Sequence, residues 1–296
     1  MADATPRRAG WTFRPVPPTP RSIVELIRSG TLDAELAATL WVLIEGRVPV
    51  IVAAADGNAG KSTLLHALLD FLPAGVTTRE LAGAGETFDW LPQASELGWQ
   101  GTPLREPPGG QPVRPDTTVL VAEELSDHLP VYTWGQEARI AIRAASIGYG
   151  LAATIHADTL EDVFEQLRRP PVRADDDELS RLGLVLVLRR LDDDRRRVAA
   201  AHYVRPTARD EHGHTQRLGP AVLATWDPLT DRFEHFGWGV TPELARRVDR
   251  KAGDFELEVE RRRDSLTDLA RSGLDDVEAV RTAIRAYRQP TPTHAT

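Results

Sequence analysis

The pattern of apolar positions divides the chain into strand-like and helix-like segments that alternate. Short uncharged runs predict buried strands at 50–55, 76–80, 117–122, 151–155, 182–188 and 198–204. Apolar residues at helical spacing predict helices between them, most clearly at 64–72, 134–147 and 159–167. Strands that alternate with helices are typical of a parallel sheet with helices on its faces. The sequence therefore predicts an α/β fold.

The same pattern predicts how the chain is organised into domains. Five prolines without a helical period at residues 1–20 predict an extended lead-in. Residues 21–205, which start with two helices between 22 and 45, form the expected core, and 206–224 a linker. Residues 225–296 begin with a turn-rich strand pair and continue as amphipathic helices near 241–249, 254–272 and 275–288. We therefore expect a C-terminal helical subdomain.

The stretch 48–72 carries the most specific motif. An apolar strand leads into a loop of small residues, then into Gly60-Lys61-Ser62-Thr63 and a helix. This order is that of the phosphate-binding loop of P-loop NTPases, where backbone N–H groups and a helix N-terminus bind phosphates. Lys61 is expected to reach the β- and γ-phosphates, and Ser62 to hold Mg²⁺. The expected nucleotide-binding residues are Gly57, Asn58, Ala59, Gly60, Lys61, Ser62 and Thr63.

One position departs from this motif. The pattern G-x-x-x-x-G-K-[ST] has glycine where this chain has Ala55. If the backbone needs a positive φ there, alanine costs about 1–2 kcal/mol, and otherwise it costs little. Gly57 is the residue expected to supply the missing freedom. A chance Gly-Lys-Ser sequence in a loop is the alternative, but Lys61 is one of two lysines among 36 basic residues, which suits a site that needs a compact charge.

Polar residues end two other predicted strands. Glu123 and Glu124 follow the strand 117–122, and His156 follows the strand 151–155. Because ligands of an open parallel sheet bind beyond the carboxyl ends of its strands, we expect these side chains beside the phosphate-binding loop. Glu124 is the candidate that orients the attacking water, the two carboxylates support Mg²⁺, and His156 is a candidate γ-phosphate sensor. The alternatives are a strand that emerges into solvent and a structural histidine.

Composition narrows the class of protein. The absence of cysteine excludes disulfides and thiolate metal sites. No apolar run approaches the roughly 18 residues that a membrane span needs, and the N-terminus lacks the apolar segment of a signal peptide. A formal net charge of −8 argues against a duplex DNA partner, because sequence-independent affinity for phosphates needs a basic surface. We expect a soluble, intracellular protein with no nucleic-acid partner.

Two histidines and two tryptophans could have a role in binding, but their sequence context favours a structural role. His212 and His214 form a pair in a polar loop with no third ligand at metal-site spacing, so they are expected to be loop residues. Trp226 and Trp238 are expected to pack in the core or between domains.

Several motifs in order make the chain similar to a known family. It resembles the motor domain of the type II/type IV secretion ATPases, most closely the archaeal branch with pilus and archaellum motors. The resemblance extends over nearly all of residues 12–288. The stretches that carry it are 26–32, 38–45, the phosphate-binding loop, 114–116, 120–124, 153–158, 226–231 and the terminal helices.

The resemblance implies a RecA-like P-loop ATPase core that uses ATP and Mg²⁺. It further implies a homo-hexamer at a membrane-embedded platform protein, in the cytoplasm at the inner face of the membrane, where ATP hydrolysis drives pilin or secretion-machine assembly. By position, Glu124 corresponds to the Walker B glutamate and His156 to the residue of the His box. Arg105 or Arg114 are the candidates to reach a neighbouring subunit's site.

The chain departs from the family in four places. Ala55 replaces the first glycine of the loop, and the family's acidic box appears as Glu80 and Glu86 with extra residues between them. Tyr149 stands where the family usually has histidine, and of the N-terminal domain only the segment 11–17 is recognisable. Two alternatives follow: a degenerate member that binds nucleotide or partners with little hydrolysis, and a nucleic-acid translocase, which the acidic balance disfavours.

Overall fold

The computed structural model describes residues 19–101, 113–209, 212 and 214–288. Most of the predicted lead-in, the segment 11–17 and Arg105 lie outside the described residues. Across the described ranges, no helix combines the length and apolarity that crossing a membrane requires.

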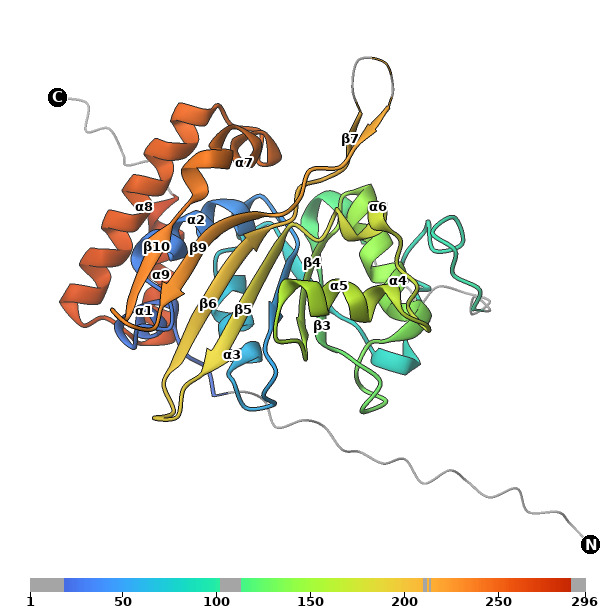
Figure 1. Ribbon diagram of the computed structural model, residues 1–296, viewed down its shortest axis with the longest axis horizontal. Helices are drawn as coiled ribbons and strands as arrows, with labels where there is room; N and C mark the ends of the chain where they lie inside the picture. The colour runs from blue at the N-terminus through green and yellow to red at the C-terminus, as the bar shows by residue number, and fades with distance from the viewer. Residues whose placement is uncertain (1–18, 102–112, 210–211, 213, 289–296) are drawn as a thin grey trace, which may run out of the picture.

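An eight-stranded mixed sheet forms the centre of the molecule (Figure 1), in the order β10-β9-β6-β5-β1-β4-β3-β2. Five neighbouring strands run parallel: β5 (Leu184–Arg190), β1 (Val50–Ala53), β4 (Gly150–Ile155), β3 (Thr118–Leu125) and β2 (Thr77–Glu80). The other three continue the sheet antiparallel: β6 (Arg196–Tyr203), β9 (Ala221–Asp227) and β10 (Arg232–His235). The predicted α/β class is confirmed, with an antiparallel extension that the strand pattern did not specify.

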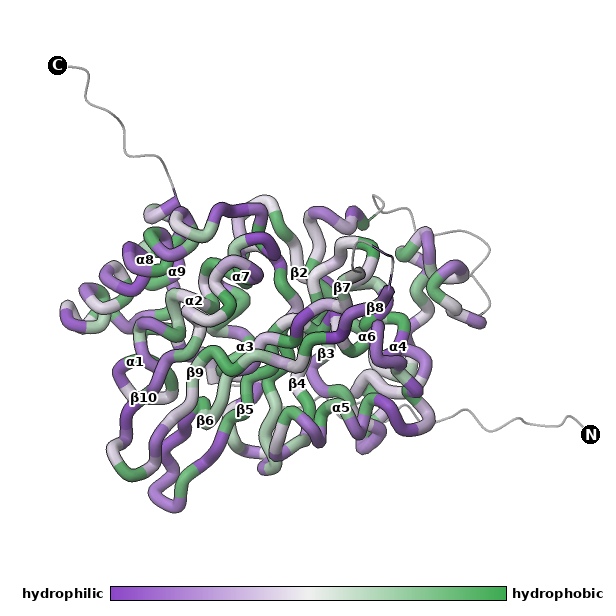
Figure 2. Tube along the Cα trace, turned by 45° about the horizontal axis from the view of Figure 1, so that its top comes forward, coloured by the Kyte–Doolittle hydropathy of each residue, from purple (hydrophilic) through white to green (hydrophobic). Residues whose placement is uncertain are grey.

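Helices cover both faces of the parallel strands, which explains why β1 and β4 are buried along their whole length. One face packs against α1 (Ile23–Arg28), α2 (Ala34–Glu45), α3 (Lys61–Leu69), α7 (Thr241–Arg247), α8 (Ala252–Ser272) and α9 (Val277–Tyr287). The other face packs against α4 (Gly135–Ala144), α5 (Leu160–Arg168) and α6 (Asp176–Leu179). Figure 2 shows the apolar strands at the centre and polar segments on the outer helices. The core is therefore two apolar layers separated by the sheet.

The segment 206–224, predicted to be a linker, contains a small hairpin and the start of a core strand. Its strands β7 (Ala208–Arg209) and β8 (Thr215–Gln216) pair only with each other, and β9 begins at Ala221. Because β9 pairs with β6, the predicted C-terminal strand pair lies in the same sheet as the core. The boundary between core and helical subdomain stays a prediction.

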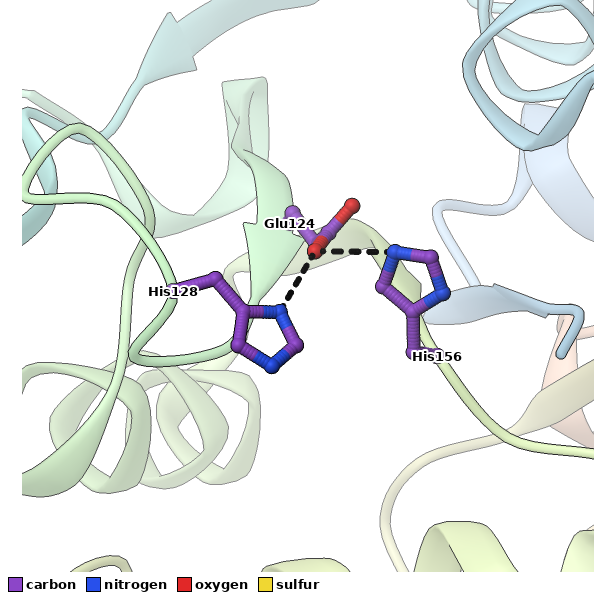
Figure 3. Close-up of side chains that lie close together, drawn as sticks. All are labelled: Glu124, His128 and His156. Atoms are coloured by element: carbon purple, nitrogen blue, oxygen red, sulfur yellow. Dashed lines mark ion pairs between the residues drawn. The ribbon is translucent and has the colours of Figure 1, made fainter. Parts of the chain in front are cut away.

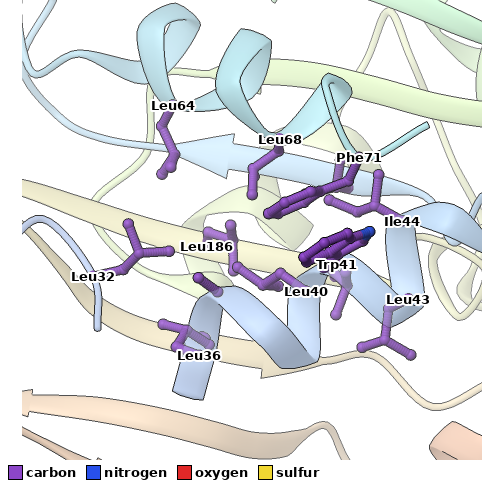
Figure 4. Packing of buried hydrophobic residues seen from close by; sticks show 14 of the residues in the cluster. Leu32, Leu36, Leu40, Trp41, Leu43, Ile44, Leu64, Leu68, Phe71 and Leu186 are labelled. Carbon is purple, nitrogen blue, oxygen red and sulfur yellow. The ribbon is translucent and has the colours of Figure 1, made fainter. Parts of the chain in front are cut away.

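An aromatic cluster joins the C-terminal helices to the sheet. The Trp41 ring on α2 stacks on Phe71 with centroids 5.1 Å apart, and Tyr287 of α9 packs on it at 5.0 Å (Figure 4 shows the first pair). The buried Arg262 guanidinium of α8 lies 4.7 Å from the Trp41 ring centroid and pairs with Glu258 at 2.8 Å. A buried cation needs such partners, so the cluster fixes α8 and α9 against α2.

The expectation that Trp238 is a packing residue is wrong. Trp238 lies on the short turn η4 (Gly237–Val240) and is 78% exposed, whereas Val240 in the same turn enters the core. Trp226 is half-buried, and its Nε1 donates a hydrogen bond to Asp231 Oδ1 at 2.8 Å. The sequence places an apolar ring in both positions, but only the turn geometry decides which side chain faces inward.

Replacing Trp41 with alanine is expected to destabilise the fold by about 3–5 kcal/mol, because the loss of a fully buried ring that contacts Phe71, α8 and α9 leaves a cavity. The matched control is Trp238→Ala, expected to change the free energy of unfolding by no more than about 0.5 kcal/mol. Urea denaturation of both variants measures the difference. Equal losses of stability would contradict the described core.

Candidate functional site

The loop between β1 and α3 ends in a glycine with a left-handed backbone. Gly60 has φ 92° and ψ 20° and stands directly before Lys61, the first residue of α3. A Cβ at Gly60 would come within 3.1 Å of Arg196 Cδ, so both the backbone angle and the space favour glycine. No side chain caps α3. Its first backbone N–H groups therefore have no acceptor within the helix or from a cap.

The departure at Ala55 carries no backbone strain. Ala55 is not among the described non-glycine residues with positive φ, so alanine fits there. The expectation that Gly57 supplies the missing freedom is wrong, because its φ is not in the left-handed region either. In this loop, the left-handed backbone conformation that favours glycine occurs at Gly60.

Lys61 is buried at the start of α3, with 3% of its surface exposed. Its Nζ lies 3.9 Å from Glu124 Oε2 and 3.4 Å from each ring nitrogen of His156. Burial lowers the pKa of Lys61, and the nearby charges of Glu124 and Asp56 oppose that shift. A buried ammonium is tolerated where a carboxylate balances it, so Lys61 and Glu124 depend on each other.

Glu123 and Glu124 lie within β3, and their side chains have different partners. The pairing of β3 with β4 shifts register between Ala122 and Leu125, which places a bulge at the two glutamates. Glu123 Oε1 lies 3.2 Å from His66 Nε2 on α3, whereas Glu124 faces Lys61. The strand was expected to end before these residues. In the structure, β3 extends through both glutamates, and the two carboxylates contact different residues of α3.

His156 follows β4 and lies between the loop and Glu124. Its Nδ1 is 3.1 Å from the carbonyl oxygen of Ala55, and its Nε2 is 3.2 Å from Glu124 Oε1. The backbone carbonyl of His156 accepts a hydrogen bond of 2.6 Å from Gln166 Nε2 on α5. The ends of β1, β3 and β4 thus bring Lys61, Glu124 and His156 together.

The remaining loop residues lie around this group. The buried Ala59 precedes Gly60, and Ser62 and Thr63 are half-buried in the first turn of α3. Asn58 is exposed, and its carbonyl oxygen accepts a hydrogen bond of 3.3 Å from Arg196 Nη2. Arg196 comes from β6, and nothing in the sequence pattern links it to the loop.

Two further neighbours of Glu124 were not predicted. Ser126 Oγ donates a hydrogen bond of 3.0 Å to Glu124 Oε1, and His128 Nδ1 lies 4.0 Å from the same oxygen (Figure 3 shows the two histidines). Both lie within four residues of Glu124 along the chain. That cluster of polar residues after a buried strand is the signal that could have identified them.

The candidates for the acidic box have separate environments. The buried Glu86 carboxylate accepts hydrogen bonds from Trp90 Nε1 and from the backbone N–H groups of Ala82, Thr87 and Phe88. It therefore organises its own loop. Glu80 is exposed at the end of β2, and its charge helps to raise the pKa of His66.

Tyr149 and Arg114 also have local partners. Tyr149 is buried and donates its hydroxyl to the carbonyl oxygen of Val113 at 2.8 Å, and burial raises its pKa. Arg114 is exposed and pairs with Asp116 at 2.5 Å.

No protein-family model matches the chain. It is similar to the uncharacterized protein MJ1287 of Methanocaldococcus jannaschii, with 26% identity over 245 residues that cover 79% of this chain and 85% of that protein. A second uncharacterized protein of that organism, MJ0900, is 23% identical over 297 residues, 96% of this chain. The matched region is 52% of MJ0900, so the chain spans about half of that relative's length.

Two solved structures overlap loosely with the fold. The VirB11 ATPase from the Brucella suis type IV secretion system matches with a TM-score of 0.31 and 18% identity, covering 73% of this chain and 53% of that one. The Yersinia pseudotuberculosis ATPase DotB matches with a TM-score of 0.33 and 16% identity, covering 91% and 63%. No conclusion about activity follows from overlaps of this size.

The His66–Glu123 pair predicts a pH dependence. The hydrogen bond to Glu123 raises the pKa of His66 above its ordinary value of about 6.5. The stability from this pair is therefore fully present below the ordinary pKa and is lost as pH rises through the raised one. Glu123→Gln is expected to lower the pKa of His66, as measured by NMR titration of the ring.

His202 is the internal control for this titration, because burial lowers its pKa and Glu123 is not among the causes. Its pKa is expected to stay the same in Glu123→Gln. If the pKa of His66 is the same in Glu123→Gln as in the wild type, Glu123 does not stabilise the protonated ring of His66.

Proposed function

We propose that this chain binds Mg-ATP at the start of α3 and hydrolyses it in a RecA-like core. The observation that carries the proposal is the convergence of three strand ends on Lys61. A left-handed glycine precedes an uncapped helix start, and the buried lysine lies 3.9 Å from Glu124 and 3.4 Å from His156. Backbone N–H groups at a helix start together with a lysine are the elements that bind phosphates.

The position of the loop in the sheet supports the RecA-like core. β1 lies inside the run of five parallel strands, between β5 and β4, and β4 separates it from β3. The loop therefore opens at the carboxyl edge of the sheet, where ligands of parallel sheets bind.

The residues around Lys61 suggest how the site works. In the nucleotide complex, Lys61 would turn from Glu124 to the β- and γ-phosphates. That leaves Glu124, which Ser126 orients through a hydrogen bond of 3.0 Å, to position the water that attacks the γ-phosphorus. His156 lies beside both groups and would report on the γ-phosphate.

The side chains present fit a magnesium ion. Mg²⁺ prefers oxygen ligands and keeps several waters, and the half-buried Ser62 offers a hydroxyl oxygen in the first turn of α3. Ser62 would hold Mg²⁺ and Glu124 would contact its water shell. The bound ion would neutralise charge on the phosphates.

We further propose that the chain is a motor subunit of a secretion, pilus or archaellum-like assembly system, acting as a homo-hexamer against a membrane platform protein. The support for this finer proposal is the series of family-like sequence stretches. The hexamer would complete each site with residues of a neighbouring copy.

The alternative is a subunit that binds nucleotide with little hydrolysis. Two observations favour it. Glu86 is one of the two acidic-box candidates, and Tyr149 stands at the position of the family's histidine. The polar atoms of both side chains are engaged in local hydrogen bonds. Tyrosine also cannot exchange a proton near neutral pH as imidazole does.

Lys61→Met is expected to abolish Mg-ATP binding while keeping the buried stem of the side chain. Lys251→Met is the matched control, since the only other lysine is exposed before α8 and far along the chain from the loop. Calorimetry with Mg-ATP measures binding, and circular dichroism checks the fold. Similar affinities in the wild type and Lys61→Met would remove the phosphate-binding assignment.

Glu124→Gln is expected to keep nucleotide binding and to lower the hydrolysis rate about 10²–10⁴-fold, because it removes the group that orients the water. Glu123→Gln should have the milder effect, since Glu123 faces His66. Phosphate release at saturating Mg-ATP distinguishes them. If the wild type hydrolyses ATP no faster than Glu124→Gln, the non-hydrolysing alternative takes the place of the motor.

A further inference from the structure

Three side chains from the ends of two neighbouring strands lie close together (Figure 3). Glu124 belongs to β3, His128 to the loop that follows it, and His156 comes directly after β4. Glu124 Oε1 lies 3.2 Å from His156 Nε2 and 4.0 Å from His128 Nδ1. One ligand atom from each lies within 4.8 Å of the other two.

The contact between His156 and Glu124 joins two hydrogen-bond acceptors. The Ala55 carbonyl, 3.1 Å from His156 Nδ1, can only accept, so Nδ1 carries the proton. In the neutral ring, Nε2 then presents its lone pair to Glu124 Oε1 at 3.2 Å. Two acceptors at this distance are stable when a positive charge lies between them. A metal ion that both groups bind supplies such a charge.

Lys61 does not fill this role. Its Nζ is 3.4 Å from both Nδ1 and Nε2 of His156. The lone-pair directions of the two ring nitrogens diverge, so an ammonium equally far from both lies along neither. The lone pair of Nε2 remains directed at the carboxylate.

The surroundings of the three side chains are those of metal ligands. A ligating histidine usually donates its other N–H to a carbonyl or carboxylate, as His156 does to Ala55. Ligating carboxylates are in turn hydrogen-bonded, as Glu124 is by Ser126 Oγ at 3.0 Å. His128 is 67% exposed, so an ion can reach the group from solvent.

We infer that Glu124, His128 and His156 form a binding site for a divalent transition-metal ion, with Zn²⁺ and Co²⁺ as the probes. Two imidazoles and one carboxylate are a donor set of zinc and of other late first-row ions, whereas Mg²⁺ and Ca²⁺ prefer oxygen ligands. Three protein ligands leave coordination positions for water. Its ligands do not include Ser62, the proposed magnesium ligand, although Glu124 would also contact the water shell of that magnesium ion.

Lys61 sets the strength of this site. Its ammonium, 3.9 Å from Glu124 Oε2, repels a second cation on the same carboxylate. The site is therefore weak while Lys61 pairs with Glu124 and stronger when that charge is removed. If the proposed hydrolysis is correct, an ion on Glu124 also slows it, because the carboxylate can no longer orient water.

The test is direct metal binding to the whole chain without nucleotide. Co²⁺ is titrated and followed by its visible absorption, and Zn²⁺ binding is measured by calorimetry and by displacement of Co²⁺. We expect one ion per chain, at least about tenfold weaker binding in His128→Ala, and tighter binding in Lys61→Met. Because Lys61→Met is expected to lack nucleotide binding, these results do not depend on the proposed ATPase function.

The hairpin histidines provide the matched control. His212 and His214 have ring centroids 6.2 Å apart and do not belong to the proposed site. The double variant His212→Ala/His214→Ala is expected to keep the full cobalt spectrum. A spectrum that is lost in the double variant and unchanged in His128→Ala overturns the proposal. Absence of a cobalt signal in both the wild type and Lys61→Met also overturns it.

Discussion

Lys61 places a positive charge in a position that is almost closed to water. The groups around it are arranged so that this buried charge is balanced. The ammonium is retained because Glu124 supplies the opposite charge at 3.9 Å. Glu124 can supply it because its side chain faces Lys61, whereas that of its neighbour Glu123 faces His66. His156 closes the group from β4. Removing either Lys61 or Glu124 would leave the charge of the other uncompensated in the core.

The sheet order makes this balance possible. β1, β4 and β3 are adjacent and parallel, so the loop, His156 and Glu124 lie at the same edge. The rest of the molecule keeps those strands fixed. The apolar layer of α1–α3 and the C-terminal helices supports one face, and Trp41 with Arg262 fixes the outer helices to it. A rigid frame of this kind positions charged groups more accurately than a loop would.

The sequence is sufficient to predict the main strands and helices, and the edge of the sheet at which the site lies, because apolar runs and helical spacing are local patterns. The strands at 50–53, 150–155 and 184–190 lie where those patterns predict. The division of labour between Glu123 and Glu124 is not local. It depends on which residue of α3 each carboxylate meets, and those contacts are set by the tertiary packing of α3 against the sheet. His128 and Arg196 reach the site through a loop and an antiparallel strand, whose paths depend on tertiary packing.

Glu124 is the central group of the site, because several neighbouring groups compete for its two carboxylate oxygens. Ser126 already donates to Oε1, Lys61 lies near Oε2, and His156 presents a ring nitrogen. A carboxylate that balances a buried ammonium cannot also act freely on water. A phosphate that attracts Lys61 would therefore both fill the loop and release the carboxylate, so that ligand binding and activation become one electrostatic event. When Lys61 leaves Glu124 for a phosphate, the carboxylate would also become able to bind another cation. The partner that Glu124 holds, whether Lys61, water or a metal ion, would therefore decide what the site can do.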